Sequence, residues 1–350
     1  MEEQAAKQVK CLIWDLDRTL WEGVLSEGGS TALREGVRET LAELDRRGIL
    51  LSIASKNEAA PAMKVLKDLG IDDLFLCPQI SWDDKAVSVQ RIMELLNLKP
   101  EAIAFIDDNP FERDAVQYQH PKVRVYDENA VPGLLSLPEF TPRFITPDSA
   151  ARRHMYQTDL LRQQAKQTFT GSSEEFLKTL QIHVAVKRVT EDDLQRVEEL
   201  TIRTHQLNAT GYTYSYDELV ELTHSPRHIF LVCSMHDRYG DNGKVGLLLL
   251  EHTSEEVMTL KLLIVSCRVM SYGIGSALLA YAMQLSHRLG KKLHAEFFQT
   301  EHNRIMYITY KMAGFEEIEE NGDQLLLSYA GEEVPTPPAY IIWDTSEAEA

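Results

Sequence analysis

The chain has 350 residues, 44% of them hydrophobic, and a formal net charge of −18 at pH 7. A chain of this length usually divides into two domains, and the apolar content is ample for two packed cores. The negative charge argues against general nucleic-acid binding, which needs a basic field, although a local basic patch can still dock an acidic partner.

Neither a membrane span nor a signal peptide is predicted. The first ten residues lack an apolar core, and the longest apolar runs are far too short to cross a bilayer. The cysteines show neither metal-ligand nor redox-motif spacing; they are Cys11, Cys77, Cys233 and Cys267. These features predict a cytoplasmic protein with reduced thiols and with no membrane or nucleic-acid partner.

Residues 1–145 alternate between strand and helix patterns. Continuous apolar runs predict strands buried on both faces, and amphipathic stretches between them predict helices. The expected strands are 9–17, 48–55, 74–77, 102–110 and 122–127, and the expected helices are 32–47, 59–70 and 85–98. This order predicts a parallel, doubly wound α/β sheet.

A helical linker is expected over residues 146–180, after a proline-rich boundary at 132–148. Its first helix, 149–168, is basic, and we weigh two interpretations of that charge: a solvated face, or a docking surface for an acidic carrier protein. The residues concerned are Arg152, Arg153, Arg162 and Lys166.

Residues 181–331 have the pattern of an α+β domain with long antiparallel strands. The expected strands are 228–235, 244–252, 256–266, 291–298 and 323–330, and the expected helices are 191–202, 272–290 and 303–315. The acidic, proline-containing stretch 332–350 is expected to be a flexible tail.

Four carboxylates are expected at the carboxyl ends of two strands. Asp15 and Asp17 follow the first apolar run, and Asp107 and Asp108 follow a later one. Residues i and i+2 of a strand point the same way, and open α/β sheets bind ligands at this edge. Because converging carboxylates repel unless a cation lies between them, the four predict a Mg²⁺ site.

Two further residues suggest phosphoryl transfer. Ser55 ends a strand, where its hydroxyl can hold a phosphoryl oxygen, and Lys85 can neutralise the charge of a pentavalent phosphorus. We expect Asp15 to attack phosphorus and Asp17 to transfer protons to the leaving group and from water. The alternative is that the acids at the strand ends only cap helices.

The order DxD, Ser, Lys, DD resembles the haloacid dehalogenase (HAD) superfamily of phosphohydrolases. The short spacings between Asp15, Ser55 and Lys85 leave no room for a cap domain, so an uncapped site open to bulky substrates is expected. On this resemblance, substrate contacts are expected from Arg18, Thr19, Ser55, Lys56 and Asn57.

The second half resembles the GNAT acyltransferases. Gly273 and Gly275 open a helix after a strand, where free N–H groups can face an anion, and Tyr310 lies in the stretch NRIMYITYKMAGF. That fold binds the pyrophosphate of coenzyme A at such a turn. Met270 departs from the usual Gln or Arg, which favours a carrier-bound phosphopantetheine arm over free coenzyme A.

Both halves in this order resemble the FkbH-like glyceryltransferase/phosphatases. This resemblance implies an enzyme that takes a glyceryl unit from 1,3-bisphosphoglycerate, removes phosphate and loads an acyl carrier protein for polyketide-type biosynthesis. Cys267 is the candidate acyl-carrying thiol, although core packing is equally open, and Cys11 is expected to be structural. The second site is expected to include His205, Gln206, Asn208, Gly273, Gly275 and Tyr310.

Two rival interpretations stay open. One is a magnesium phosphatase with a degenerate GNAT-like domain. The other is a binding module whose GNAT-like half only recruits a carrier protein.

Overall fold

The computed structural model describes residues 8–204, 207–301, 303–331 and 333–348. The chain divides into two compact units, Met1–Leu160 and Leu161–Ala350. None of the helices in the described part combines the length and the apolar composition that a membrane span requires.

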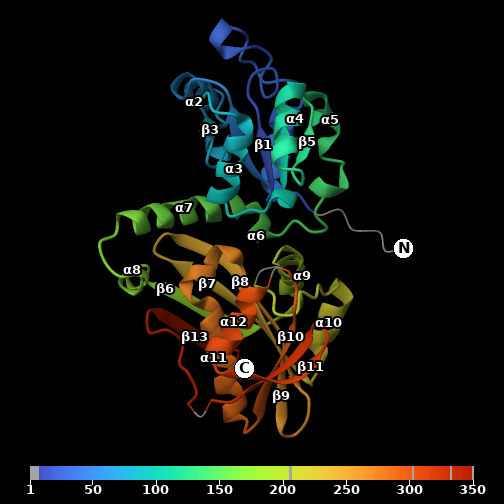
Figure 1. Cartoon of the computed structure of the whole chain (residues 1–350), viewed down its shortest axis with the longest axis vertical. Coiled ribbons are helices and arrows are strands. Elements are labelled where there is room, and N and C mark those ends of the chain that lie inside the picture. The colour runs from blue at the N-terminus through green and yellow to red at the C-terminus, as the bar shows by residue number, and fades with distance from the viewer. Residues whose placement is uncertain (1–7, 205–206, 302, 332, 349–350) are drawn as a thin grey trace. The chain divides into compact units, whose positions relative to one another are not determined.

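The first unit is built on a five-stranded parallel sheet (Figure 1). Its strand order is β3-β2-β1-β4-β5. The strands are β1 (Cys11–Trp14), β2 (Leu50–Ser55), β3 (Gln79–Ile80), β4 (Ile103–Ile106) and β5 (Arg124–Tyr126). The helices are α1 (Val37–Arg46), α2 (Ala59–Asp68), α3 (Lys85–Leu95), α4 (Pro110–Gln119), α5 (Val131–Leu134) and α6 (Pro147–Ala150).

Helices cover both faces of this sheet. Leu12 and Trp14 of β1 face one core together with residues of α1, α2 and α5. Cys11 and Ile13 face the other core together with residues of α3 and α4. All four residues of β1 are buried, as expected for a central strand covered on both sides. The predicted doubly wound architecture is confirmed.

The proline-rich stretch 132–148 is part of the first unit, which corrects its interpretation as a boundary. Leu134 and Phe140 are buried in the α1-side core, and Arg47 donates hydrogen bonds to the carbonyls of Leu135 and Phe140. The division between the units instead falls within α7 (Arg152–Thr168). This point lies inside 146–180, the range expected to be a helical linker, and the chain is helical there over 147–150, 152–168 and 173–179.

The arginines of α7 do not form a solvated or docking face. Arg152 is buried and donates to the carbonyl of Gly48 at 3.0 Å, and Arg153 forms an ion pair with Asp45 at 3.0 Å. Arg162 forms an ion pair with Asp237 at 2.6 Å. These three side chains stabilise their own units, so neither interpretation fits the arginines; Lys166, the fourth residue considered, is exposed.

The second unit has an eight-stranded mixed sheet of order β11-β12-β10-β9-β8-β7-β6-β13. Its strands are β6 (Ile182–Arg188), β7 (His228–Asp237), β8 (Gly240–His252), β9 (Val257–Val265), β10 (Lys292–Phe298), β11 (Phe315–Asn321), β12 (Gln324–Tyr329) and β13 (Ile341–Glu347). Its helices after α7 are α8 (Ser173–Thr179), α9 (Leu194–Arg203), α10 (Tyr216–His224), α11 (Ile274–Arg288) and α12 (Arg304–Met312). The expected α+β class is confirmed.

The segment expected to be a flexible tail contains β13. This strand pairs in parallel with β6, with Ile341 opposite Ile182 and Trp343 opposite Val184. Ile341 is buried, and Trp343 packs against the same core. The tail prediction is wrong for this part of the chain, because the strand covers an edge of the sheet.

Candidate active site

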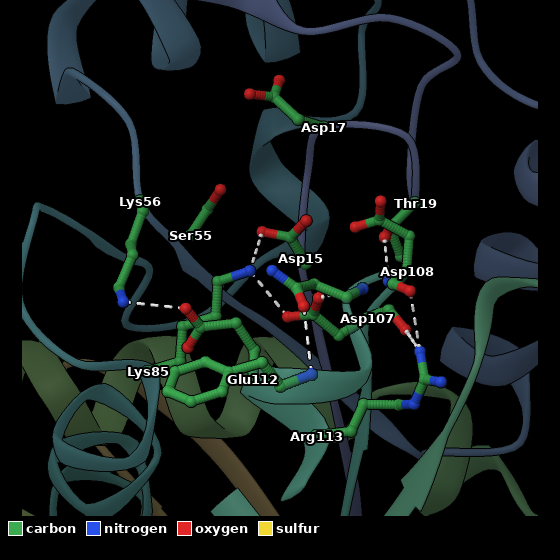
Figure 2. Close-up of polar contacts among 12 residues, drawn as sticks. Asp15, Asp17, Thr19, Ser55, Lys56, Lys85, Asp107, Asp108, Glu112 and Arg113 are labelled. Carbon is green, nitrogen blue, oxygen red and sulfur yellow. Dashed lines mark hydrogen bonds and ion pairs between the residues drawn. The ribbon is translucent and has the colours of Figure 1, made fainter. Parts of the chain in front are cut away.

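The chain turns sharply where β1 ends. The carbonyl oxygen of Leu16 accepts hydrogen bonds from three N–H groups of the turn, at 2.9 to 3.3 Å. The extended conformation therefore stops at Trp14, and the side chains of Asp15 and Asp17 do not share a strand face. Figure 2 shows the Asp17 carboxylate away from the group around Asp15.

Three of the four predicted carboxylates come together. Asp15, Asp107 and Asp108 each offer an oxygen, and these oxygens lie within 4.8 Å of one another. Asp15 is 3% exposed and Asp107 is fully buried. Because β1 and β4 are neighbouring parallel strands, their carboxyl ends bring these residues to one edge of the sheet.

Lys85, the first residue of α3, joins the two buried carboxylates. Its Nζ lies 2.8 Å from Oδ1 of Asp15 and 2.6 Å from Oδ2 of Asp107. Burial raises the pKa of Asp15 against the opposing effect of Lys85, and burial together with the Asp15 charge raises that of Asp107. One ammonium does not balance three carboxylates, so the group has the charge and the oxygen donors that suit a divalent cation.

Asp107 and Asp108 have different surroundings. Asp107 is anchored, because Oδ1 accepts from the N–H of Asn109 at 2.9 Å and Oδ2 accepts from Lys85. The backbone of Asp108 is fixed through its N–H, which donates to Oγ1 of Thr19 at 3.0 Å. Within the described part of the chain, nothing donates a hydrogen bond to the Asp108 carboxylate, which leaves it available to a cation.

We therefore expect Asp108→Ala to weaken Mg²⁺ binding more than Asp107→Ala does. Loss of a direct ligand should lower the affinity at least about 100-fold, whereas loss of a supporting carboxylate should lower it about 10-fold. Calorimetric titration of both variants with Mg²⁺ measures this difference. The reverse order of affinities would mean that Asp107 is the principal ligand.

Asp17 does not belong to the metal group, which corrects its predicted role as a ligand. Its Oδ1 accepts hydrogen bonds from Nε1 of Trp21 at 2.7 Å and from the N–H of Leu25 at 3.1 Å. Its Oδ2 accepts from Nδ2 of Asn57 at 3.1 Å. These donors hold the carboxylate in the loop that follows β1.

Ser55 and its two successors lie at the end of β2, on the same edge. Ser55 and Asn57 are both buried, and the Ser55 hydroxyl accepts from Nδ2 of Asn57 at 3.2 Å. Lys56 forms an ion pair with Glu112 at 2.8 Å. Asn57 therefore links the Ser55 and Asp17 segments, whereas the ammonium of Lys56 already has an acidic partner.

Sequence reasoning missed three supporting residues, namely Trp21, Glu112 and Arg113. Arg113 donates to the carbonyl oxygens of Asp107 at 2.6 Å and Asp108 at 2.9 Å and so fixes the turn between β4 and α4. Glu112 and Arg113 stand in the stretch FIDDNPFER directly after the paired acids, where their position gave a signal. The contact of Trp21 with Asp17 depends on a loop that shows no comparable pattern.

In the second unit, the glycine turn is covered by the chain itself. Gly273 has a φ of +78° and precedes α11, as the sequence predicts for a tight turn. A Cβ atom at this position would clash with the hydroxyl of Tyr340, which lies just before β13. In this conformation, Tyr340 contacts the backbone of the turn that was expected to bind an anion; Gly275 has no such neighbour.

The gap between β9 and β10 is also filled. The two strands pair only from Lys292 to Ala295, and beyond this the segment 207–209 lies between them. The N–H of Ala209 donates to β9, and the N–H of Phe298 donates to Ala209. Asn303 holds the insertion through hydrogen bonds from Nδ2 to the carbonyls of residues 208, 209 and 298. Residues 207–209 therefore bridge the two strands beyond Ala295.

The other predicted residues of the second site have mixed outcomes. Asn208 is buried, and its side chain bonds the backbone of residues 210–212. Tyr310 is fully buried between aromatic rings, and burial raises its pKa. Cys267 is half-buried at the start of a 3₁₀ turn. His205 and Gln206 lie outside the described residues.

The remaining cysteines have structural environments. Cys11 is fully buried on β1, and burial raises the pKa of its thiol. Cys233 is also fully buried, with its pKa raised to about 12. Cys77 is half-buried, with its pKa raised by burial to about 11. Because thiolates are the nucleophilic form, these three are poor candidates for acyl transfer.

Residues 22–116 match the family of haloacid dehalogenase-like hydrolases. This range includes Ser55, Lys85 and the paired acids but begins after Asp15. Among solved structures, the N-terminal part of the protein BF1531 from Bacteroides fragilis, which contains a phosphatase domain complexed with Mg, is 28% identical with a TM-score of 0.33. That match covers 39% of this chain and 41% of the other.

Other solved structures that are similar to part of the chain include acetyltransferases. The PaiA N-acetyltransferase from Thermoplasma acidophilum, in complex with coenzyme A, is 15% identical, covers 41% of this chain and 97% of its own, and has a TM-score of 0.34. The ribosomal-protein-S18-alanine N-acetyltransferase from Escherichia coli is 16% identical, with 43% and 99% covered and a TM-score of 0.33. No curated protein matches the sequence. Residues 22–116 are thus similar to haloacid dehalogenase-like hydrolases, and acetyltransferases are among the solved structures that match part of the chain.

Proposed function

We propose that the first unit is a Mg²⁺-dependent phosphatase with Asp15 as its nucleophile. The observation that carries this proposal is the meeting of Asp15, Asp107 and Asp108 within 4.8 Å, with Lys85 bridging the two buried members. A cation bound here would neutralise phosphoryl oxygens as charge develops on them. Asp15, Asp107 and Asp108 are the residues that would hold it.

The side chains of this unit have distinct parts in the reaction. The Asp15 carboxylate attacks phosphorus, and the bond to the leaving oxygen breaks, giving an aspartyl phosphate that water then hydrolyses. Lys85 holds Asp15 in place and offers positive charge to the phosphoryl group. Asp17 donates a proton to the leaving oxygen and later accepts one from water. For this, its carboxylate must turn away from Trp21 and toward Asp15.

For the whole chain, we propose glyceryl transfer coupled to phosphate removal. The Cys267 thiolate attacks the acyl phosphate of 1,3-bisphosphoglycerate and releases phosphate. The thiol of a phosphopantetheine arm on an acyl carrier protein then takes the glyceryl group and restores the Cys267 thiol. The remaining phosphate monoester is removed at Asp15. The sequence resemblance of both halves to FkbH-like enzymes supports this proposal, as does the half-buried position of Cys267.

A second candidate function has specific support in the second unit. Tyr340 covers the glycine turn, and residues 207–209 fill the gap between β9 and β10. Both features favour a domain that recruits a carrier protein without transferring an acyl group. The phosphatase of the first unit would then act alone.

Intact-mass measurement of a carrier protein separates the two candidates. The carrier is incubated with 1,3-bisphosphoglycerate and either the wild type, Cys267→Ala or the control Cys77→Ala. We expect glyceryl loading by the wild type and the control, and at least about a 100-fold lower rate with Cys267→Ala. Normal loading by Cys267→Ala would mean direct attack of the carrier thiol on the acyl phosphate. Phosphate release with no loading by any form would favour the recruiting domain.

A further inference from the structure

Arg18 has an unusual backbone conformation beside the candidate active site. It directly follows Asp17 and has a φ of +56°. This value lies in the left-handed region of backbone conformation, which residues other than glycine and asparagine rarely adopt. Non-glycine residues in this region cost conformational free energy, and they gather at functional sites. An arginine at this position therefore suggests a function for its side chain.

The surrounding loop fixes this conformation from both sides. The N–H of Arg18 donates to the carbonyl of Gly23 at 3.1 Å, and Nη1 of Arg34 donates to the carbonyl of Arg18 at 2.8 Å. The side chain of Arg18 itself is exposed. The backbone is thus held in place while the guanidinium stays accessible to solvent.

The other cations around the site already have partners. Lys85 contacts Asp15 and Asp107, Lys56 contacts Glu112, and Arg113 bonds two carbonyl oxygens. For Arg18, no carboxylate of residues 8–204, 207–301, 303–331 or 333–348 lies within ion-pair distance. Its charge is therefore available to a ligand.

An anionic ligand needs a local positive charge to bind to this acidic protein. The chain carries a net charge of −18, which repels a substrate with two negative groups. A cavity of about 350 Å³ beside the same loop is poorly suited to bind an anion. Its one arginine, Arg34, shares the lining with Glu22, Glu35 and Glu128. A local, unpaired guanidinium that can bind a carboxylate or phosphate bidentately meets the need.

We propose that Arg18, next to Asp17 in the loop that follows β1, is a specificity-determining residue whose guanidinium binds a second anionic group of the substrate. The inference rests on the proposed phosphatase function of the first unit. Among free substrates, it makes bis-anionic phosphate esters the preferred class.

The test compares two phosphate esters, 3-phosphoglycerate and glycerol 3-phosphate. The first has a carboxylate where the second has a neutral hydroxymethyl group. The wild type is compared with Arg18→Asn, which suits the left-handed region but lacks the charge, and with Arg18→Lys, which keeps the charge. Arg46→Asn, which removes an exposed arginine of α1 that pairs with Glu43, is the control. Values of kcat and KM are measured for both esters, and the melting temperature is measured for each protein.

We expect the wild type and the control to prefer 3-phosphoglycerate through a lower KM. Arg18→Asn should reduce this preference about tenfold without lowering the melting temperature, and Arg18→Lys should keep most of it. An unchanged KM ratio in Arg18→Asn would overturn the inference while leaving the phosphatase proposal intact. A wild type that hydrolyses neither ester would overturn the phosphatase proposal, and this inference with it.

Discussion

Asp15→Asn is expected to lower the rate of phosphate release at least about 10³-fold, because the substitution removes the nucleophile and one charge of the cation site. The fold should persist. Burial raises the pKa of Asp15, so its ionised form costs stability above the pKa of the unfolded chain, and an amide of the same shape removes that cost at neutral pH.

Steady-state phosphate release and thermal unfolding of Asp15→Asn measure the two effects separately. Asp68→Asn is the matched control, because Asp68 is an exposed residue of α2 that pairs only with Lys64 among the described residues. Phosphate release near the wild-type rate in folded Asp15→Asn would remove Asp15 from the mechanism. A variant that melts far below the wild type would instead show that Asp15 is chiefly structural.

Lys85→Met should lower both activity and stability. The variant leaves the carboxylates of Asp15 and Asp107 side by side without their shared cation. Removing one partner of a buried ion pair typically costs about 3–5 kcal/mol, and loss of one charge-stabilising group lowers kcat about 10²–10³-fold.

Denaturant unfolding with and without Mg²⁺ identifies the cause of the lost stability. A bound divalent cation should restore part of it, since it replaces the missing positive charge between the carboxylates. Lys64→Met, which breaks the exposed pair with Asp68, should change stability by no more than about 0.5 kcal/mol. Equal stability of Lys85→Met and the wild type would contradict the electrostatic account of the site.

The sequence predicts the edge of the sheet that carries the site, because each acid directly follows a buried apolar run. Asp15, Asp107 and Asp108 come together for that reason, and Lys85 reaches two of them from the first turn of α3. The position of Asp17 could not be predicted in the same way. The rule that residues i and i+2 face alike holds only within a strand, and the chain turns at Leu16.

Other differences between prediction and structure come from contacts distant in sequence. Arg152 meets Gly48, and Arg162 meets Asp237, across 104 and 75 positions respectively. A helical pattern of basic residues does not reveal such partners. Likewise, the acidic and proline-containing composition after residue 331 obscures β13, which depends on pairing with β6.

The glycine turn illustrates how a local signal can be correct in geometry and incomplete in function. The sequence predicts a tight turn before a helix, and Gly273 has the left-handed conformation that such a turn requires. The pattern cannot show that Tyr340 covers the turn, because this contact joins segments that are far apart in the chain.

The most direct test of the central claim is to trap the phosphorylated enzyme. Wild-type protein is mixed with Mg²⁺ and 3-phosphoglycerate, quenched in acid within the first turnover, digested, and analysed by mass spectrometry. We expect one phosphorylated peptide, with the phosphate on Asp15, and none from Asp15→Asn under the same conditions. Two results would contradict the assignment of Asp15 as the nucleophile. One is a phosphopeptide whose phosphate is on another residue during turnover, and the other is the same phosphopeptide from Asp15→Asn.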